Sequence, residues 1–534
     1  MDYQLTISTI VRRAERFSAS REVVTRLPDR TYHRTTYADL CRRARLLGSA
    51  LTRLGLPAEA RVATLCWNHH QHAEVYFGAP IAGLITHPIN PRLHHDDVAF
   101  IAAHADDSVL IVDQSLFGVY EQIRDRTSFE HVIVVGTTTP PPGTTGYEEL
   151  LATGTPDWRP PDLDEHTTAL VTYTSGTTGR PKGVTVSHRA IVLHTLSSAL
   201  PDWLAIGDSD VLMPVVPMYH ALAWGWPYTA ALLAAKLVLP GPHLDPSSLL
   251  EIIQTERVTV TGGVPTIWAG VLQELDDHPG RYDVSSLRSV LSGGSTAPPS
   301  MIEGYRERHG VPLTHTWGMT EMIMGAIAKP SWDMAGASPA EQARQRAKQG
   351  RPMPLVEIRA RGDDGLVPWD GHSMGELEIS GPWVATEYLK ATDTTAERWT
   401  HDGWLRTGDI VTIDERGYIH IQDRAKDLIK SGGEWISSPT MESALTEHPA
   451  VAEAAVIAIP HPRWGERPLA IVTLRPGVHA TSDQLLAFIT PKLAKWWLPE
   501  RIEITETIPK NAVGKIDKAA VRRDYAPELR QEQH

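Results

Sequence analysis

Cysteine is almost absent from this chain of 534 residues, which contains only Cys41 and Cys66. Two cysteines cannot form a disulfide framework or a cysteine-rich metal site. No stretch approaches roughly 18 uncharged apolar residues, so we expect no membrane span. The N-terminus also lacks a basic region followed by a long apolar core, which predicts no signal peptide. These absences favour a reducing, cytoplasmic setting.

Positive charge is also in the minority, because the formal net charge is −13. That balance favours solubility and argues against nucleic acid as a partner. An anionic substrate would then require local positive charge. The length exceeds one ordinary hydrophobic core, so more than one domain is expected.

Helical and β-branched segments alternate along the first part of the chain. Thr36 and Asp39 stand at capping-box-like spacing, and leucines then recur at helical spacing as far as Leu54. Short strand-like runs lie at residues 108–113, 131–136, 236–240, 258–261 and 289–291. Strands that alternate with helices predict parallel sheets covered on both faces.

A domain boundary is predicted near residue 423. Residues 417–422 resemble a strand, and the following stretch is charged and then glycine-rich. The remainder contains strand-like runs at 455–459 and 470–474 and a helical segment at 439–448. We therefore expect an α/β protein with a large N-terminal domain of parallel-rich sheets flanked by helices, residues 1–422, and a small C-terminal α+β domain, residues 423–534.

Residues 173–183 form a loop rich in hydroxyls and glycine after the strand-like run 169–171. Its hydroxyl groups belong to Thr174, Ser175, Thr177 and Thr178, and its glycines are Gly176, Gly179 and Gly183. Arg180 and Lys182 add positive charge. Successive backbone N–H groups in such a turn make an anion-binding concavity, which predicts a polyphosphate site. It is not a Walker loop, because Pro181 stands where that loop needs its second glycine. The alternative is an ordinary surface turn.

Further motifs follow in order. They are Pro217-Met-Tyr-His220, Leu291-Ser-Gly-Gly-Ser-Thr-Ala-Pro298, Trp317-Gly-Met-Thr-Glu321, Gly403-Trp-Leu-Arg-Thr-Gly-Asp409, Asp423-Arg424 and the stretch Ile508–Lys518. In this order the motifs resemble the adenylate-forming superfamily of acyl-CoA synthetases, peptide-synthetase adenylation domains and luciferases, over about residues 35–520. Finer features, such as Trp67-Asn68, Ala223-Trp-Gly225 and Lys495-Trp-Trp-Leu-Pro499, resemble the medium- and long-chain fatty acyl-CoA ligase branch.

The resemblance implies a two-step, AMP-forming ligase that uses ATP, Mg²⁺ and, in the second step, coenzyme A. A carboxylate would attack the α-phosphorus of ATP, giving an acyl-adenylate and pyrophosphate. The small domain, a mobile lid hinged near Asp423, would then rotate, and coenzyme A would displace AMP. The predicted partners are thus a small carboxylic acid, ATP and coenzyme A or another small nucleophile.

The same resemblance assigns the nucleotide site. The loop residues 174–179 and Lys182 would hold the β- and γ-phosphates, and Glu321 would bind Mg²⁺ with Thr174. Asp409 and Arg424 would hold the ribose. The remaining nucleotide-binding residues would be Gly294, Ser295, Thr296, Trp317, Gly318, Met319, Thr320 and Lys430, with Trp317 offering a face to adenine and Thr320 sitting on the α-phosphate. Trp317 could instead be a core residue, and Asp409 a turn aspartate.

Lys515 is the predicted catalytic residue of the first step, together with Thr174, Glu321 and His220. Negative charge builds on the α-phosphate and the attacking carboxylate, and a positioned ammonium stabilises it. The alternative for Lys515 is a solvated surface lysine.

The predicted acyl pocket departs from the fatty-acid branch. Its residues would be Tyr219, His220, Trp224, Gly293, Thr296, Met322, Ile323 and Met324. Thr296 stands where alanine is usual, and we expect its buried hydroxyl to meet a polar group of the substrate. Met322-Ile323 replaces a usual Ser-Pro, and Glu387 replaces a glycine. A medium-length, aryl or cinnamate-like acid therefore remains open.

Other functions remain open on the same fold. The chain could activate nitrite with ATP and diazotise an amino-aryl acid, or it could load an acyl group onto a carrier protein. A non-catalytic binding protein is a further alternative, which Lys515, Glu321 and Asp409 disfavour.

Overall fold

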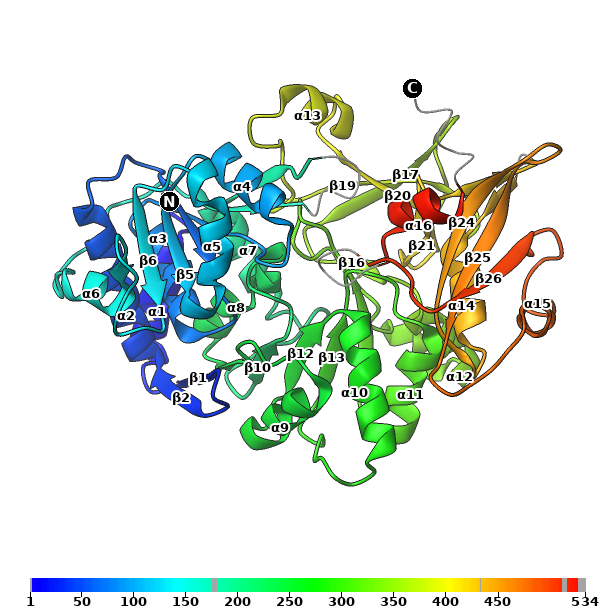
Figure 1. The fold of residues 1–534 in the computed structure, drawn as a ribbon, viewed down its shortest axis with the longest axis horizontal. Coiled ribbons are helices and arrows are strands. Elements are labelled where there is room, and N and C mark those ends of the chain that lie inside the picture. The colour runs from blue at the N-terminus through cyan, green and yellow to red at the C-terminus, as the bar shows by residue number, and fades with distance from the viewer. Residues whose placement is uncertain (1, 175–179, 433, 511–515, 527–534) are drawn as a thin grey trace.

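The structure is a computed structural model that describes residues 2–174, 180–432, 434–510 and 516–526. Figure 1 shows the N-terminal part, in blue and cyan, at one end of the molecule and the C-terminal part, in orange and red, at the other. The green middle of the chain lies between them. The segment 175–179 and Lys515, on which several predictions depend, lie outside the described residues.

A predominantly parallel sheet forms the N-terminal part, in the order β7-β6-β5-β3-β4-β8-β9. Its strands are β3 (Arg61–Leu65), β4 (Ile85–Pro88), β5 (Asp107–Asp113), β6 (His131–Val135), β7 (Thr145–Gly146), β8 (Thr168–Tyr173) and β9 (Gly183–Ser187). Neighbours pair in parallel except β8 and β9, which are antiparallel. The strands predicted at 108–113, 131–136 and 169–171 are confirmed in this sheet.

A second sheet follows the order β16-β15-β14-β13-β12-β10-β11-β1-β2. Its strands are β1 (Glu22–Arg26), β2 (Tyr32–Thr36), β10 (Val211–Pro214), β11 (Lys236–Leu239), β12 (Val260–Gly263), β13 (Ser289–Ser292), β14 (Leu313–Trp317), β15 (Ala326–Ile327) and β16 (Arg351–Pro352). Parallel pairs run through its centre, and antiparallel pairs close both edges. The fold is therefore the predicted α/β class.

Helices pack against these sheets. They are α1 (Ile7–Phe17), α2 (Tyr37–Arg53), α3 (His70–Ile81), α4 (His95–His104), α5 (Phe117–Ile123), α6 (Tyr147–Ala152), α7 (His188–Ser197), α8 (Trp226–Leu233), α9 (Pro246–Glu256), α10 (Pro265–Asp277), α11 (Pro299–His309), α12 (Pro339–Arg346) and α13 (Thr392–Arg398). The predicted cap of α2 is confirmed, because the Thr36 hydroxyl accepts a hydrogen bond from the Asp39 N–H at 3.3 Å. Leu40, Leu47 and Leu51 are fully or almost fully buried on its apolar face.

Two further sheets complete the chain. The antiparallel order β18-β17-β19-β20-β21 contains β17 (Glu357–Gly362), β18 (Gly365–Leu366), β19 (Gly375–Ser380), β20 (Leu405–Ile413) and β21 (Ile419–Arg424). The last sheet contains β22 (Ile429–Ser431), β23 (Glu434–Ile436), β24 (Val451–His461), β25 (Gly465–Leu474) and β26 (Arg501–Thr505), with α14 (Ser438–Thr446), α15 (Ser482–Ile489) and α16 (Lys518–Tyr525) in the same region. Strand β21 extends to Arg424, so the proposed division at residue 423 falls near its end.

The junction at Asp423 is tied to the first turn of α14. The Asp423 carboxylate accepts hydrogen bonds from the Ser438 N–H at 3.0 Å and the Ser438 hydroxyl at 2.6 Å. Burial raises the pKa of Asp423, whereas the nearby Lys518 ammonium lowers it. Lys518 in turn pairs with Glu442 at 2.8 Å. The N-cap residue of α14 is Ser437, so Asp423 binds the start of this helix from β21 without being its cap residue, and its function as a hinge remains a proposal.

Gly350 connects the second and third sheets. Its backbone forms a bridge to Ile419 in β21, and its φ is +103°. A Cβ atom at this position would lie 1.9 Å from the carbonyl carbon of Ile327 in β15. Backbone atoms cannot move aside for it, so only glycine fits here.

We therefore expect Gly350→Ala to lower the free energy of unfolding by more than about 4 kcal/mol, or to prevent folding. Gly365→Ala is the control, because Gly365 has a φ of +126° but open space around its Cβ position. It should cost only about 1–3 kcal/mol of backbone strain. Guanidinium unfolding of both variants tests this, and equal losses would contradict the steric argument.

Candidate active site

The base of the predicted phosphate loop is a hydrogen-bonded hairpin. The Thr174 N–H donates to the Lys182 carbonyl, and the Lys182 N–H donates to the Thr174 hydroxyl, each at 3.0 Å. These two residues directly follow β8 and precede β9. The loop thus leaves the sheet between two antiparallel strands, whereas a Walker loop leads from a strand into a helix.

Lys182, Tyr388 and Glu321 form a chain of contacts beside this loop. The Lys182 ammonium lies 5.1 Å from the centre of the Tyr388 ring, and the Tyr388 hydroxyl donates to Glu321 Oε1 at 2.5 Å. Tyr388 reaches this position because it pairs with Val184 at the edge of β9. A buried carboxylate and an ammonium therefore lie close to the base of the predicted phosphate loop, an arrangement that suits a phosphate and metal site.

Charges of both signs surround the Lys182 ammonium: the Arg398 guanidinium and the carboxylates of Glu321 and Glu397. Burial lowers the pKa of Lys182, and the neighbouring Arg398 guanidinium lowers it further. Burial and the adjacent Glu321 carboxylate raise the pKa of Tyr388, which keeps the phenol protonated as a donor at neutral pH. Two neighbouring cations that repel each other favour the binding of a polyanion between them.

A second cluster joins three residues predicted for the nucleoside. The Trp317 Nε1–H donates to Asp409 Oδ2 at 3.0 Å, and the Arg424 guanidinium pairs with Asp409 Oδ1 at 2.8 Å. They come from the ends of β14 and β21 and from the middle of β20. Asp409 is only 1% exposed. Its carboxylate keeps further lone pairs, so it can accept from sugar hydroxyls as well.

The turn after Trp317 is tightly packed. Ile323 has a φ of +66°, and a Cβ atom at Gly318 would lie 2.2 Å from the Ile323 carbonyl oxygen. The side chains of Met322, Ile323 and Met324 are 0–2% exposed and belong to one apolar cluster with Trp317 and Trp224. Three of the predicted acyl-pocket residues therefore lie together with two aromatic rings.

Trp224 reaches the same region from an unusual backbone segment. The 3-10 turn η3 (Ala221–Gly225) places Leu222, Ala223 and Trp224 in the left-handed region, with φ values of 48–54°. The Trp224 ring then covers the backbones of Gly262 and Gly293, where added Cβ atoms would lie 2.5 Å and 3.2 Å from it. Such strain persists only where the surrounding structure enforces it, and it is frequent at ligand sites.

Tyr219 and His220 line a small cavity of about 20 Å³ together with Thr174. The Tyr219 hydroxyl is buried and has no hydrogen-bond partner within the described part of the chain. Since buried polar groups are normally paired, this hydroxyl indicates a place for a polar ligand atom. The cavity connects the start of the phosphate loop with the predicted acyl wall.

The structure also places Thr296 and Lys430, two of the predicted site residues. The expectation that the Thr296 hydroxyl is buried is wrong, because residues 294–296 are exposed at the surface of the turn after β13. Water can satisfy that hydroxyl, so the argument from burial does not apply. Lys430, which was predicted to bind the nucleotide, lies in β22. Its ammonium is 4.3 Å from the centre of the Trp435 ring.

Tyr388 and Arg398 also lie near Lys182, although the motifs in the sequence did not indicate them. Arg398 ends α13, and its Nε is buried without a partner among the residues described here. Neither residue stands in a motif with Lys182 or Glu321. The position of Tyr388 depends on the pairing of the segment between β19 and α13 with β9, which no local pattern indicates.

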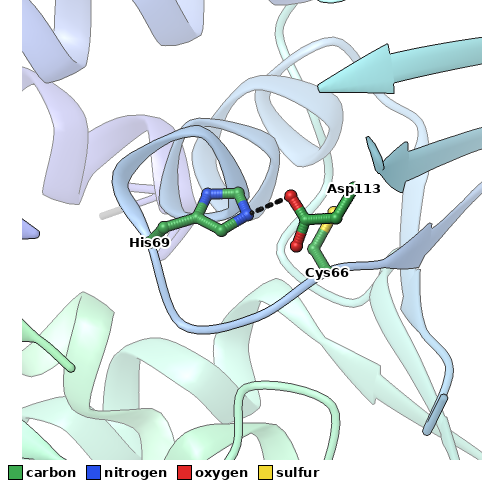
Figure 2. Close-up of side chains that lie close together, drawn as sticks. All are labelled: Cys66, His69 and Asp113. Carbon is green, nitrogen blue, oxygen red and sulfur yellow. Dashed lines mark hydrogen bonds and ion pairs between the residues drawn. The ribbon is translucent and has the colours of Figure 1, made fainter. Parts of the chain in front are cut away.

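Cys66, His69 and Asp113 lie close together after β3 and at the end of β5 (Figure 2). Their polar atoms are already engaged: His69 Nε2 donates to Asp113 Oδ1 at 2.9 Å, and His69 Nδ1 accepts from the His72 N–H. The other Asp113 oxygen accepts from the Trp67 N–H, and the Cys66 thiol contacts the Ile111 carbonyl. Burial raises the pKa of the thiol. These hydrogen bonds therefore connect the segment after β3 to the end of β5.

Comparison with known families accounts for most of the chain. Residues 10–389 match the family of AMP-binding enzymes, and residues 440–515 match the C-terminal domain of AMP-binding enzymes. The protein belongs to the AMP-binding enzyme family, in its acyl-CoA ligase branch.

Individual relatives match over almost their whole length. A long-chain-fatty-acid–CoA ligase of Thermus thermophilus is 43% identical, over 98% of this chain and 96% of the relative. A 3-methylmercaptopropionyl-CoA ligase of Ruegeria lacuscaerulensis is 41% identical, over 99% of each chain. A solved structure of an anthranilate CoA ligase in complex with anthranoyl-AMP superposes with a TM-score of 0.88 at 25% identity, over 99% of both chains.

The protein is thus an ATP-dependent, AMP-forming ligase of the acyl-CoA ligase type, with ATP, Mg²⁺ and coenzyme A as its cofactors and co-substrates. Among the helices in the described ranges, none is long and apolar enough to cross a membrane.

The contact between Tyr388 and Glu321 yields a prediction. Tyr388→Phe keeps the ring beside Lys182 and removes the donor that orients the carboxylate. If Glu321 binds Mg²⁺, the Mg²⁺ concentration for half-maximal ATP-dependent turnover should rise about 10-fold, as is typical when the partner of a metal ligand is lost. A Mg²⁺ titration of turnover at saturating ATP measures this.

Tyr305→Phe is the matched control. Its hydroxyl is equally buried and donates to the Trp268 carbonyl at 2.7 Å, outside the site. This variant should lose stability without changing the Mg²⁺ dependence. An unchanged Mg²⁺ dependence in Tyr388→Phe would exclude the proposed function of Glu321.

Proposed function

We propose that this enzyme activates a medium-length or aryl carboxylic acid as its adenylate and transfers the acyl group to coenzyme A. The observation that carries the proposal is that Trp317 and Arg424 both bind the buried carboxylate of Asp409. Trp317 also belongs to the apolar cluster that contains Trp224 and Met322–Met324. A nucleoside site and an apolar pocket that share Trp317 suit an acyl-adenylate.

In the first step, a carboxylate oxygen of the acid attacks the α-phosphorus of ATP. The bond from that phosphorus to the bridging oxygen breaks, and pyrophosphate leaves with the electron pair. Lys182 and Arg398 would hold the departing phosphates, and Lys515 would stabilise the charge on the α-phosphate. Asp409 would hold the ribose while Trp317 orients Asp409.

The residues around Glu321 fit a magnesium ion. Mg²⁺ prefers oxygen ligands, and Glu321 offers a buried carboxylate that Tyr388 holds in place. Thr174 offers a hydroxyl at the start of the same loop. Bound Mg²⁺ would neutralise charge on the transferred phosphates.

In the second step, the thiolate of coenzyme A attacks the carbonyl carbon of the acyl-adenylate. The bond from that carbon to the phosphate oxygen breaks, and AMP leaves. Coenzyme A is the proposed acceptor because the ligases of Thermus and Ruegeria, named for coenzyme A thioesters, match this chain over almost its whole length. Tyr219 and His220 would separate the acyl group from the incoming thiol.

One assay tests the proposal against the nitrite-dependent and carrier-protein alternatives. The enzyme is incubated with ATP, Mg²⁺ and a panel of alkyl, aryl and amino-aryl acids, with and without coenzyme A, nitrite or a carrier protein, and AMP and products are followed by mass spectrometry. An acyl-thioester of coenzyme A is expected. Nitrite-dependent AMP release with an amino-aryl acid, or a mass shift of the carrier alone, would overturn the proposal.

Lys515 gives a separate prediction. Lys515→Ala should abolish ATP–pyrophosphate exchange but spare thioester formation from supplied acyl-AMP, because the ammonium acts only while negative charge builds in the first step. Loss of one such donor typically costs about 2.7–4 kcal/mol of transition-state stabilisation.

Lys510→Ala is its control. Lys510 belongs to the same segment, but its ammonium pairs with Glu453 at 2.6 Å at the surface. An exposed pair contributes about 0–1 kcal/mol, so exchange should continue at the normal rate. Normal exchange in Lys515→Ala as well would refute the assignment of Lys515.

A further inference from the structure

His194 is a buried histidine whose ring nitrogens form no hydrogen bond within the described part of the chain. It lies in α7 and is 0% exposed, and neither ring nitrogen has a hydrogen-bond partner among the residues that the structure describes. Burial lowers its pKa to about 3, so the imidazole is neutral at physiological pH. A neutral imidazole still carries one N–H donor and one acceptor, and leaving both unpaired costs free energy.

The ring lies between two segments that neighbour predicted acyl-pocket residues. On one side, Nδ1 faces the backbone of Gly225, where a Cβ atom would lie only 2.8 Å away. On the other side, the ring packs edge-to-face on Trp383, with centroids 5.6 Å apart. Trp383 in turn donates to the Met324 carbonyl at 3.3 Å. His194 therefore connects the segment of Trp224 with the segment Met322–Met324.

Apolar side chains from four segments lie together around this position. Ile191 and Val192 of α7, Trp224, Trp383 and Met322–Met324 belong to one cluster of buried side chains. In such surroundings a leucine would pack without the cost of two unpaired nitrogens. The imidazole is thus a polar group among apolar side chains. Ligand pockets commonly use such isolated polar groups to orient and select their ligands.

We propose that His194 determines substrate specificity by hydrogen bonding to a neutral polar group of the acid, such as a hydroxyl, keto, ether or aryl-amino group. The inference rests on the proposed function and narrows its substrate class to acids that carry such a group besides the reacting carboxylate. A second carboxylate is disfavoured, because an uncharged imidazole cannot compensate a buried anion.

Matched pairs of acids test the proposal. Cinnamate is compared with 4-hydroxycinnamate and 4-aminocinnamate, and octanoate with hydroxy- and keto-octanoates, by competition for coenzyme A thioester formation. In the wild type, kcat/KM should favour the polar member of at least one pair by about tenfold or more, since a site built to hydrogen-bond a group rejects the analogue that lacks it. His194→Leu should abolish this preference, mainly by raising KM for the polar acid.

Three further variants make the test specific. His194→Gln keeps a donor and an acceptor and should retain part of the preference, and His194→Phe replaces the leucine variant if that protein does not fold. His188→Leu is the matched control. His188 lies in the same helix and is 1% exposed, but its Nδ1 accepts from the Ile7 N–H at 3.3 Å. This variant should keep the wild-type ratio.

The outcomes separate the two proposals. If acids are converted but the wild type prefers no polar member, or the apolar variants at His194 leave the ratio within twofold, the inference about His194 is wrong and the proposed function stands. If no acid yields a coenzyme A thioester, the proposed function fails and the inference fails with it.

Discussion

The carboxylate of Asp409 is the point on which the arrangement of the site depends. A buried charge needs compensating partners, and Asp409 has them in Trp317 and Arg424. Trp317 ends a strand of the second sheet, whereas Asp409 and Arg424 belong to the third. One carboxylate therefore joins the second and third sheets. The same bonds would hold the ribose in the proposed nucleoside site.

Close backbone packing shapes the acyl side of the site in a similar way. Trp224 lies flat on Gly262 and Gly293, and Gly318 lies against the Ile323 carbonyl. Any side chain at these glycines would displace an aromatic ring or a turn. The proposed acyl pocket therefore depends on positions where the absence of a Cβ matters. In the proposed pocket, the buried imidazole of His194 would have a large influence on which acids bind.

Many features of the fold could be predicted because they are local. The cap at Thr36 and the strands at 108–113 and 131–136 depend on residues close together in the sequence, where spacing and propensity decide. The burial of Thr296 was mispredicted, because exposure depends on what packs over a turn rather than on the turn itself. Tyr388 and Arg398 were missed for the same reason, since their partners lie far away in the chain.

By itself, the sequence determined the chemistry: the ordered motifs specify a nucleotide-dependent, AMP-forming ligase, because hydroxyls, glycines and charges at set spacing are what polyphosphate requires. Tertiary structure decided the surroundings of those groups. The pairing of residue 388 with β9 brings Tyr388 to Glu321. The packing of α7 beside Gly225 leaves the ring nitrogens of His194 without a partner among the described residues. Motifs depend on neighbours in the chain, whereas specificity depends on contacts between segments hundreds of residues apart.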